Sequence, residues 1–566
     1  MASLFIMDYV PGCILASQRK LLATYAAPVA RSVACLAAMI LLVLCSLPMP
    51  ATGAELPPTL HGAQRVMIEV ARATTPPLRD LARLNSSPRW LWQPRTIPLG
   101  RVPLLIAPEQ FDPVLQRGRL PASATKQGLD FEGIGAGLPG FFVEGIPPDP
   151  NLSVGATQIV EWVNLSFAVF DKTTGALVME PVEGNALWSA LGGQCAADND
   201  GDPIVKYDQL AGRWLMSQLA VTGGPPFYQC IAVSKTSDAT GSYNVYAYRM
   251  PDFNDYPKVA VWPDAYYLSF NMFDALGNYL QPEACAMDRA AMLAGASAPI
   301  ECFSPGSSYF GLLPSDLDGS TPPPTGSPDY FVSYDVNSLD LWRFHANFAN
   351  PANATFSGPI NIPVAPFTPA CDGGHCIPQP DSSVRLDSLA DRLMYRLAYR
   401  NFGDHESLVA DHSIKVSKPV RVPSAVRWYE IRDPEGTPVL FQQGTYAPNE
   451  RARWMGSVAM DKLGDLAVGY SESSATMHPS IAYASRLASD PLGGLRAETL
   501  AFRGRGSQLE KRRLCKKQCY RWGDYSAMAI DPADDCTFWY VNEYLARSGN
   551  YNWHTRIVSF KFPGCS

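Results

Sequence analysis

One pattern recurs seven times along this chain, and it limits the possible folds more than any other feature of the sequence. Each copy has an acidic or polar first residue, a short apolar segment, a turn rich in Asp, Gly or Pro, and an aromatic segment that ends in a polar residue. Successive copies start 52 to 74 residues apart. The seven first residues are Asp149, Asp202, Asp255, Asp329, Asp381, Arg453 and Asp524.

Each copy is typical of a β-hairpin, and the residues between copies leave room for one or two further strands. One such unit cannot bury both of its faces, whereas units stacked radially around an axis can. A pair of β-sandwiches would not require every copy to keep the same kind of first residue and the same aromatic second strand. We therefore predict an all-β fold, a β-propeller, with seven blades favoured over six or eight.

The chain is expected to have three parts, of which the propeller is the last. Residues 1–54 are predicted to be a signal peptide, because Arg31 precedes an apolar run too short to span a bilayer and small residues follow that run up to Ala54. Residues 55–145 are a Pro-rich lead-in that is expected to wrap or close the propeller of residues 146–566. The smaller expected elements are a helix within 63–84, a strand within 131–143 that closes the ring against 556–562, a helix within 285–293 capped by Asp288, and an irregular loop over 314–328.

The cysteines favour an exported protein, in the periplasm or outside the cell. Three of the 13 cysteines fall in the leader, which leaves an even number, and export permits disulfides. Zinc is disfavoured because the chain has no CxxC pair. The pairs expected from nearness in sequence are Cys195 with Cys230, Cys285 with Cys302, Cys371 with Cys376, Cys515 with Cys519, and Cys536 with Cys565.

Charge and hydropathy exclude two classes of partner. The formal net charge is −7, whereas a nucleic-acid surface needs clustered Lys and Arg. No segment after the leader approaches the length needed to span a membrane. We expect a monomer that binds no nucleic acid and does not span a membrane once the signal is removed.

Four segments resemble a group of exported bacterial β-propeller-like proteins, most of which have no assigned function. The resemblance covers about residues 146–565, and it implies the fold and the export without supplying catalytic residues. A basic insert over 511–517 looks atypical for the group. The four segments are GDPIVKYDQLAGRW, DYPKVAVWPDAYYLSFN, DRLMYRLAYRNFGDHESLV and WGDYSAMAIDPADDCTFWYVNEY.

The register of the repeat predicts which residues gather at one mouth of the propeller. The first residue of each copy lies before the inner strand, and the loop after the second strand returns to the same end. For each Asp alone, a structural role is the favoured interpretation: a cap, or a bond to the backbone of a neighbouring blade. A ligand-binding role for the whole ring of Asp residues is the alternative.

Polar residues that occur in one blade only are the candidates for chemistry at this mouth. Two carboxyls, one protonated and one ionised, could hydrolyse a glycosidic bond, and a His with a Tyr could remove a proton from a uronic acid held by Arg, as a lyase requires. The candidate catalytic residues are Tyr399, His405, Glu406, Glu472 and Glu543. The candidate substrate-binding residues are Asp202, Asp255, Asp524, Arg396, Arg400, Asn401 and Asn542.

The acidic turn formed by Asp198, Asp200 and Asp202 is the candidate metal site. Carboxylate oxygens around a glycine turn suit calcium, although the distant Glu of an EF-hand loop is missing. A solvated acidic turn explains the same residues equally well. The sequence predicts no organic cofactor, because it contains no phosphate loop and no dinucleotide fingerprint.

Two functions from different classes remain open. The first is a secreted carbohydrate-active propeller, a glycoside hydrolase or a polysaccharide lyase, whose partner is an extracellular polysaccharide. The second is a non-catalytic extracellular binding or surface-interaction protein, because a fold alone does not imply an activity.

Overall fold

The computed structural model describes residues 64–84, 95–97, 99–105, 108–118, 120–139, 141–417, 421–509 and 520–566. The predicted signal peptide, the basic insert and the Cys515–Cys519 pair lie outside these ranges. Within them, no helix combines the length and the apolar character that crossing a membrane requires.

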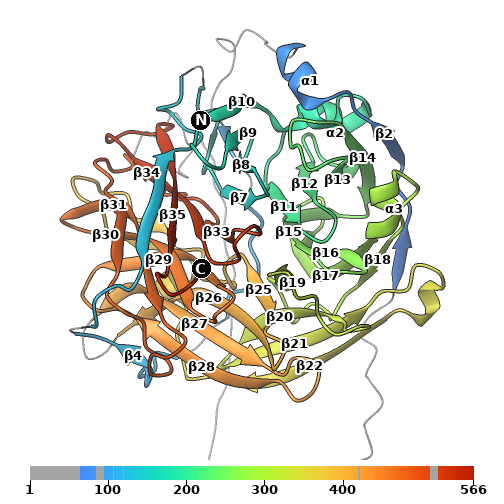
Figure 1. The fold of residues 1–566 in the computed structure, drawn as a ribbon. Coiled ribbons are helices and arrows are strands. Elements are labelled where there is room, and N and C mark those ends of the chain that lie inside the picture. The colour runs from blue at the N-terminus through green and yellow to red at the C-terminus, as the bar shows by residue number, and fades with distance from the viewer. Residues whose placement is uncertain are drawn as a thin grey trace, which may run out of the picture. The chain divides into compact units, whose positions relative to one another are not determined.

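Antiparallel strands build seven successive units in the described part of the chain, and each unit runs outward from an inner strand near the centre (Figure 1). The first three units are β7(Pro150–Val154), β8(Gln158–Val163), β9(Ser166–Asp171) and β10(Leu177–Glu183); β11(Ile204–Asp208), β12(Arg213–Ala220), β13(Phe227–Ser234) and β14(Tyr243–Met250); and β15(Phe253–Val261), β16(Ala265–Phe273), β17(Tyr279–Asp288) and β18(Ile300–Phe303). The next two are β19(Leu313–Asp318), β20(Asp329–Asp335), β21(Ser338–His345) and β22(Thr355–Pro363); and β25(Leu397–Asn401), β26(Glu406–Val416), β27(Val422–Arg432) and β28(Val439–Tyr446). The last two are β29(Ala452–Met460), β30(Leu466–Ser474), β31(Met477–Arg486) and β32(Thr499–Phe502); and β33(Ala527–Ile530), β34(Phe538–Leu545) and β35(Trp553–Lys561).

The inner strands contact one another in a closed cycle, from β7 through β11, β15, β19, β25, β29 and β33 back to β7. β19 and β25 also pair in parallel, so the fourth and fifth units share one nine-stranded sheet. Radial antiparallel units around a common centre are the architecture of a β-propeller, and the predicted all-β propeller fold is confirmed.

The lead-in adds outer strands to units formed much later in the chain. β1(Arg65–Met67) pairs with β18, β2(Ala71–Thr74) with β14, β4(Leu115–Gln116) with β28, and β5(Lys126–Glu132) with β35. The closing strand β5 therefore starts earlier than the expected 131–143 segment and overlaps it only at residues 131–132, with Phe131 opposite Ile557. The prediction of a helix within 63–84 is wrong for the first half of this range, because β1 and β2 pair there with the outer strands of two units. Only α1(Leu78–Leu84) is helical.

Two other sequence expectations need correction. Residues 285–287 belong to β17, and the helix α3(Arg289–Ala294) begins only after Asp288, whose carboxylate accepts a hydrogen bond from the Ala291 N–H at 2.9 Å, as an N-cap does. The loop expected over 314–328 contains β19, the inner strand of the fourth unit. The copies that begin at Asp329 and Asp381 are therefore out of register, because Asp329 opens a second strand and Asp381 lies well before the inner strand β25.

Aromatic side chains fill the space between units. Trp162, Trp214, Tyr267 and Trp342 all come from second or third strands and are fully buried, as packing between units requires. Four of the five expected disulfides are present in the described residues, namely Cys195–Cys230, Cys285–Cys302, Cys371–Cys376 and Cys536–Cys565.

Candidate functional site

Four of the repeated Asp residues gather at one end of the inner strands. The Asp524 N–H donates to the Asp149 carboxylate at 2.7 Å, and Asn164 donates to the same carboxylate at 2.9 Å while accepting from the Asp202 N–H at 3.0 Å. Burial raises the pKa of Asp202 well above its usual range, and the charges of Asp255 and Asp149 raise it further. These contacts join neighbouring units through backbone groups, as the structural interpretation of the repeat predicts.

The lead-in covers this end of the channel. The Gly100 N–H donates to the Asp255 carboxylate, and Arg521, ion-paired with Asp524, donates to the Ile97 carbonyl at 2.9 Å. Beneath this cover lies Lys258, 1% exposed, whose ammonium is 3.3 Å from the centre of a tyrosine ring. Burial lowers the pKa of Lys258 to about 7. The predicted substrate-binding residues Asp202, Asp255 and Asp524 are therefore enclosed by protein in this structure.

The predicted substrate-binding arginines lie inside the channel, where each joins several units. Arg396 contacts Asp316 at 2.9 Å and Asp318 at 2.6 Å on β19, and its Nε donates to the Met528 carbonyl of β33. Arg400 makes a two-point ion pair with Asp535 at 2.7 and 2.9 Å. Both guanidinium groups are engaged by protein acceptors, so they stabilise the assembly of the units.

The residues predicted around His405 lie at the other end of the inner strands. The repeat predicts that β25 is a second strand, and this prediction is wrong because β25 is an inner strand. The Asn401–Glu406 turn therefore faces away from the repeated Asp residues. Tyr399 donates to Glu406 at 2.5 Å, and His405 pairs with the exposed Asp404 at 2.7 Å. Asn401 bonds the carbonyl of residue 322. This group is not brought together with Glu472 or Glu543.

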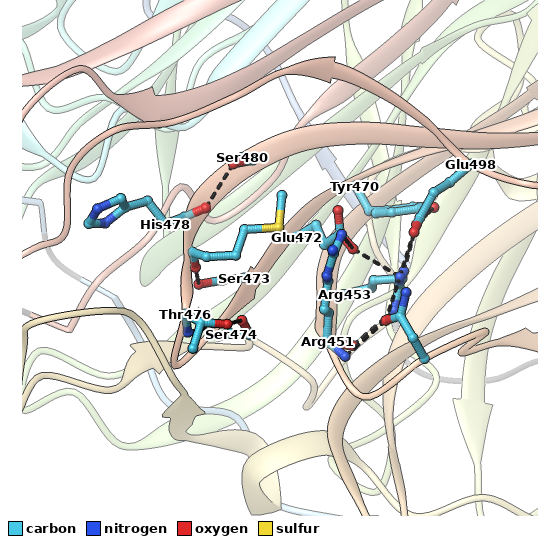
Figure 2. Close-up of polar contacts among 12 residues, drawn as sticks. Arg451, Arg453, Tyr470, Glu472, Ser473, Ser474, Thr476, His478, Ser480 and Glu498 are labelled. Carbon is cyan, nitrogen blue, oxygen red and sulfur yellow. Dashed lines mark hydrogen bonds and ion pairs between the residues drawn. The ribbon is translucent and has the colours of Figure 1, made fainter.

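Glu472 and Glu543 lie at the covered end, each bound by the protein. Glu472 forms ion pairs with Arg451 and Arg453, with nitrogen–oxygen distances of 3.1 and 2.9 Å. Arg453 also forms an ion pair with Glu498, and these contacts are drawn in Figure 2. Glu543 is fully buried and accepts from the Gly523 N–H at 2.9 Å, and burial raises its pKa well above the usual range. The neighbouring Asn542 donates to Ser471 and Tyr540.

The three aspartates proposed for calcium do not bring their ligand atoms within 4.8 Å of one another in the described residues, although Asp198 and Asp200 both lie near the N–H of residue 222. Asp200 accepts from the N–H groups of residues 221 and 222 at 2.6 and 2.8 Å and pairs with Arg95, whereas Asp202 faces Asp255 in the channel. In the described ranges, the one group of three ligand atoms within 4.8 Å of one another is Glu283 with Cys285 and Cys302, and those two cysteines form a disulfide. Calcium at Asp198, Asp200 and Asp202 stays a prediction, and it would require these side chains to turn toward one another.

A cavity of about 370 Å³ opens beside the covered end, and it is the strongest candidate site. It lies between the 99–105 segment of the lead-in and the 371–375 loop, which the Cys371–Cys376 disulfide ties together. The two-stranded sheet of β23(His375–Ile377) and β24(Leu386–Asp387) places His375 directly opposite Asp387. The Asp387 N–H donates to the Tyr520 carbonyl at 2.9 Å, which fixes a third segment against this sheet.

Two carboxyl groups in the cavity wall have different environments. Asp387 is 6% exposed, and burial raises its pKa to about 6, although the charge of Arg521 and a bond from the Leu389 N–H act in the opposite direction. Asp391 forms a two-point ion pair with Arg392 at 2.7 and 3.0 Å. One carboxyl that holds its proton to about pH 6 and one carboxylate held by a guanidinium are the pair that acid–base chemistry needs.

An exposed aromatic surface borders the same cavity. The ring of His375 stacks on Tyr520, with the ring centres 4.2 Å apart and the planes inclined by 11°. A second cavity of about 510 Å³ shares Cys371, Asp372 and His375 with the first, and Lys415 and Arg421 also line it. The two cavities form one groove along the 371–376 loop.

The repeat does not predict this site. From the sequence, Cys371 and Cys376 are expected only to form a disulfide, and His375, Asp387 and Asp391 are not among the predicted site residues. One signal was present: the fifth copy carries three Asp residues within eleven positions, more than a turn of the repeat requires.

No family model matches the chain, and no curated protein matches it either, so the resemblance to exported bacterial proteins stays a prediction. Solved structures with partial similarity include an exo-β-1,3-galactanase from Clostridium thermocellum, with 10% identity, a TM-score of 0.28, and coverage of 59% of this chain and 77% of the other. An endo-arabinase from Bacteroides thetaiotaomicron has 12% identity, a TM-score of 0.25, and coverage of 50% and 92%. The polysaccharide lyase Uly1 has 9% identity, a TM-score of 0.34, and coverage of 78% and 100%. Each TM-score is below 0.5, so these likenesses assign neither an activity nor a substrate to this chain.

Proposed function

We propose that this protein is an exported glycoside hydrolase whose active site is the groove along the 371–376 loop. The observation that carries the proposal is the raised pKa of Asp387, about 6, in the wall of a cavity that is also lined by Asp391, the ion-pair partner of Arg392. Hydrolysis of a glycosidic bond uses one carboxyl as a general acid and a second as a base or nucleophile. Four disulfides in the described residues support the exported location.

Each residue of the groove then has a distinct role. Asp387 protonates the departing sugar oxygen, and Asp391 acts on the opposite side of the bond or through a water molecule. The stacked rings of His375 and Tyr520 offer an apolar surface to a sugar face. The 99–105 segment forms the other wall and limits the access of water.

The proposal is tested with the mature protein on a panel of neutral and acidic polysaccharides. We expect new reducing ends, and we expect Asp387→Asn to lower the rate at least about 100-fold, as loss of a general acid does. The melting temperature of this variant should change little, because Asn resembles the protonated carboxyl. Asp335→Asn, an exposed substitution elsewhere, is the control. Products with unsaturated uronates would instead identify a lyase and contradict these roles.

The rate should also depend on pH in a defined direction. Because a general acid must be protonated, kcat/KM is expected to fall as the pH rises through about 6, the pKa of Asp387. A rate that stays constant from pH 5 to pH 8 would exclude Asp387 as the acid.

A non-catalytic glycan-binding protein is the second candidate, and one observation favours it. Asp387 is only 6% exposed, and Asp391 is already engaged by Arg392. If this function is correct, glycans bind without new reducing ends, and Asp387→Asn leaves their Kd unchanged.

A further inference from the structure

A third cavity, outside the groove, has the chemistry of an anion site. Its volume is about 630 Å³, and the segment after β4, the loop before β29 and the turn between β30 and β31 form its walls. Pro378, which follows the groove loop, also lines it. The charged lining residues are Arg117, Arg451 and Glu450.

Arg117 has no hydrogen-bond or ion-pair partner among the residues that the structure describes. Its Nη1 atom is buried, and a buried donor without an acceptor is unfavourable, more so when it is charged. Arg117 lines the cavity, and a rotation of its side chain would bring this covered nitrogen to an anion seated there. Arg117 therefore points to a ligand more strongly than an arginine in solvent would.

Arg451 supplies a second guanidinium to the same cavity. One of its nitrogens lies 3.1 Å from Glu472, and the side chain is 44% exposed, so further donors remain for a ligand. Glu472 itself is shared with Arg453 at 2.9 Å and is 1% exposed, so its charge is already compensated within the protein. Arg451, Arg453 and Glu472 are drawn together in Figure 2.

Hydroxyl groups complete the set of donors. The hydroxyl oxygens of Ser474 and Thr476 lie 3.3 Å apart in the turn between β30 and β31. If one hydroxyl group donates to the other, the second hydroxyl hydrogen remains for a ligand. Two guanidinium groups with neighbouring hydroxyls match the oxygens of a carboxylate or a sulfate. Glu450 is exposed and is the one carboxylate in the lining, and it opposes binding.

We propose that this cavity binds an oxyanion, either the carboxylate or sulfate group of an acidic glycan or a free inorganic anion. The proposal does not depend on hydrolysis in the groove.

The test measures Kd by calorimetry at low and high salt for three probes: inorganic sulfate, an oligosaccharide of glucuronic acid, and a neutral oligosaccharide of the same length. We expect Arg117→Gln and Arg451→Gln each to weaken binding of the anionic probes at least 5-fold. Glu450→Gln should tighten this binding, and Arg249→Gln, an exposed control, should leave it unchanged. Tightening by Glu450→Gln keeps the test valid if an arginine variant fails to fold.

The probes also distinguish the source of the anion. A glucuronate oligosaccharide that binds at least 10-fold more tightly than sulfate identifies an acidic glycan, and equal affinities identify a free anion. The proposal is overturned if no anionic probe binds, or if the Kd of the anionic probes is the same in the wild type, Arg117→Gln and Glu450→Gln. Hydrolysis can persist in either case, so this failure is distinct from failure of the proposed function.

Discussion

Asp411 is a carboxyl group in the core, and neither of its oxygens has a hydrogen-bond partner among the described residues. It lies on β26, is fully buried, and burial alone raises its pKa well above the usual range. A charged group in such a place is costly, so the carboxyl keeps its proton in the folded state. The close approach of Gly456 leaves no room for a larger neighbour, since an added Cβ there would lie 1.8 Å from Asp411.

The pH dependence of stability follows from this raised pKa. The folded state keeps the proton of Asp411, whereas the unfolded state loses it above about pH 4. The contribution of Asp411 to the free energy of unfolding is therefore fully present below that pH, and it is lost as the pH rises toward the raised pKa. The loss is up to about 1.4 kcal/mol per pH unit. We expect Asp411→Asn, which carries no proton to lose, to gain stability over the wild type as the pH rises from 4 to 8. Urea unfolding at several pH values measures this, and a constant difference across the range would contradict it.

The 99–105 segment is an element whose position depends on one glycine. Gly100 donates its N–H to Asp255 and approaches the channel so closely that an added Cβ would lie 2.4 Å from the Phe273 ring and 2.5 Å from the Asp255 carboxylate. The segment covers the acidic end of the channel and also forms one wall of the candidate active site. Its position therefore determines both features.

Gly100→Ala should lift this segment and destabilise the protein by about 1–3 kcal/mol, the usual cost of overpacking. We expect a lower melting temperature and faster cleavage by trypsin after Arg101. Gly564→Ala, where an added Cβ meets no atom within 4 Å, is the matched control. Equal cleavage rates in Gly100→Ala and the wild type would show that the segment tolerates a side chain here.

The elements also show how far sequence reasoning reaches. The first residues of five copies lie where the repeat predicts, at the start of an inner strand or just before it, because these inner strands are apolar enough to recognise. The predicted register is wrong at β19, an inner strand that the sequence predicts to be a loop. Its residues Asp316 and Asp318 form ion pairs with Arg396 inside the channel. A strand that carries channel ion pairs lacks the apolar pattern of a strand, and the ion pairs form only when distant units assemble. The candidate active site was missed for the same reason, since loops from the lead-in and from two units form it.

At the scale of the whole molecule, the ring is closed by a strand from the lead-in. β5 pairs with β35, so the seventh unit contains residues more than 400 positions apart in sequence. The Leu129 N–H donates to Ser559 Oγ at 2.8 Å in this pairing. Disruption of β5 should therefore weaken the seventh unit.

Leu129→Pro removes that N–H and is incompatible with a paired strand interior. We expect a loss of about 2–4 kcal/mol in the free energy of unfolding, larger than for Leu129→Ala, which keeps the N–H and loses only side-chain packing. Urea unfolding of both variants measures the difference. Closure by β5 would be dispensable if the two variants had the same stability.

The lead-in strands also affect the order in which the chain can fold. β1, β2, β4 and β5 leave the ribosome first, yet their partners β18, β14, β28 and β35 follow between about 170 and 430 residues later. During synthesis these early strands have exposed edges and nothing to pair with, and such edges promote aggregation. The last unit cannot be completed before nearly the whole polypeptide has been made. A cell that makes this protein must therefore keep β5 unpaired until β35 has been made.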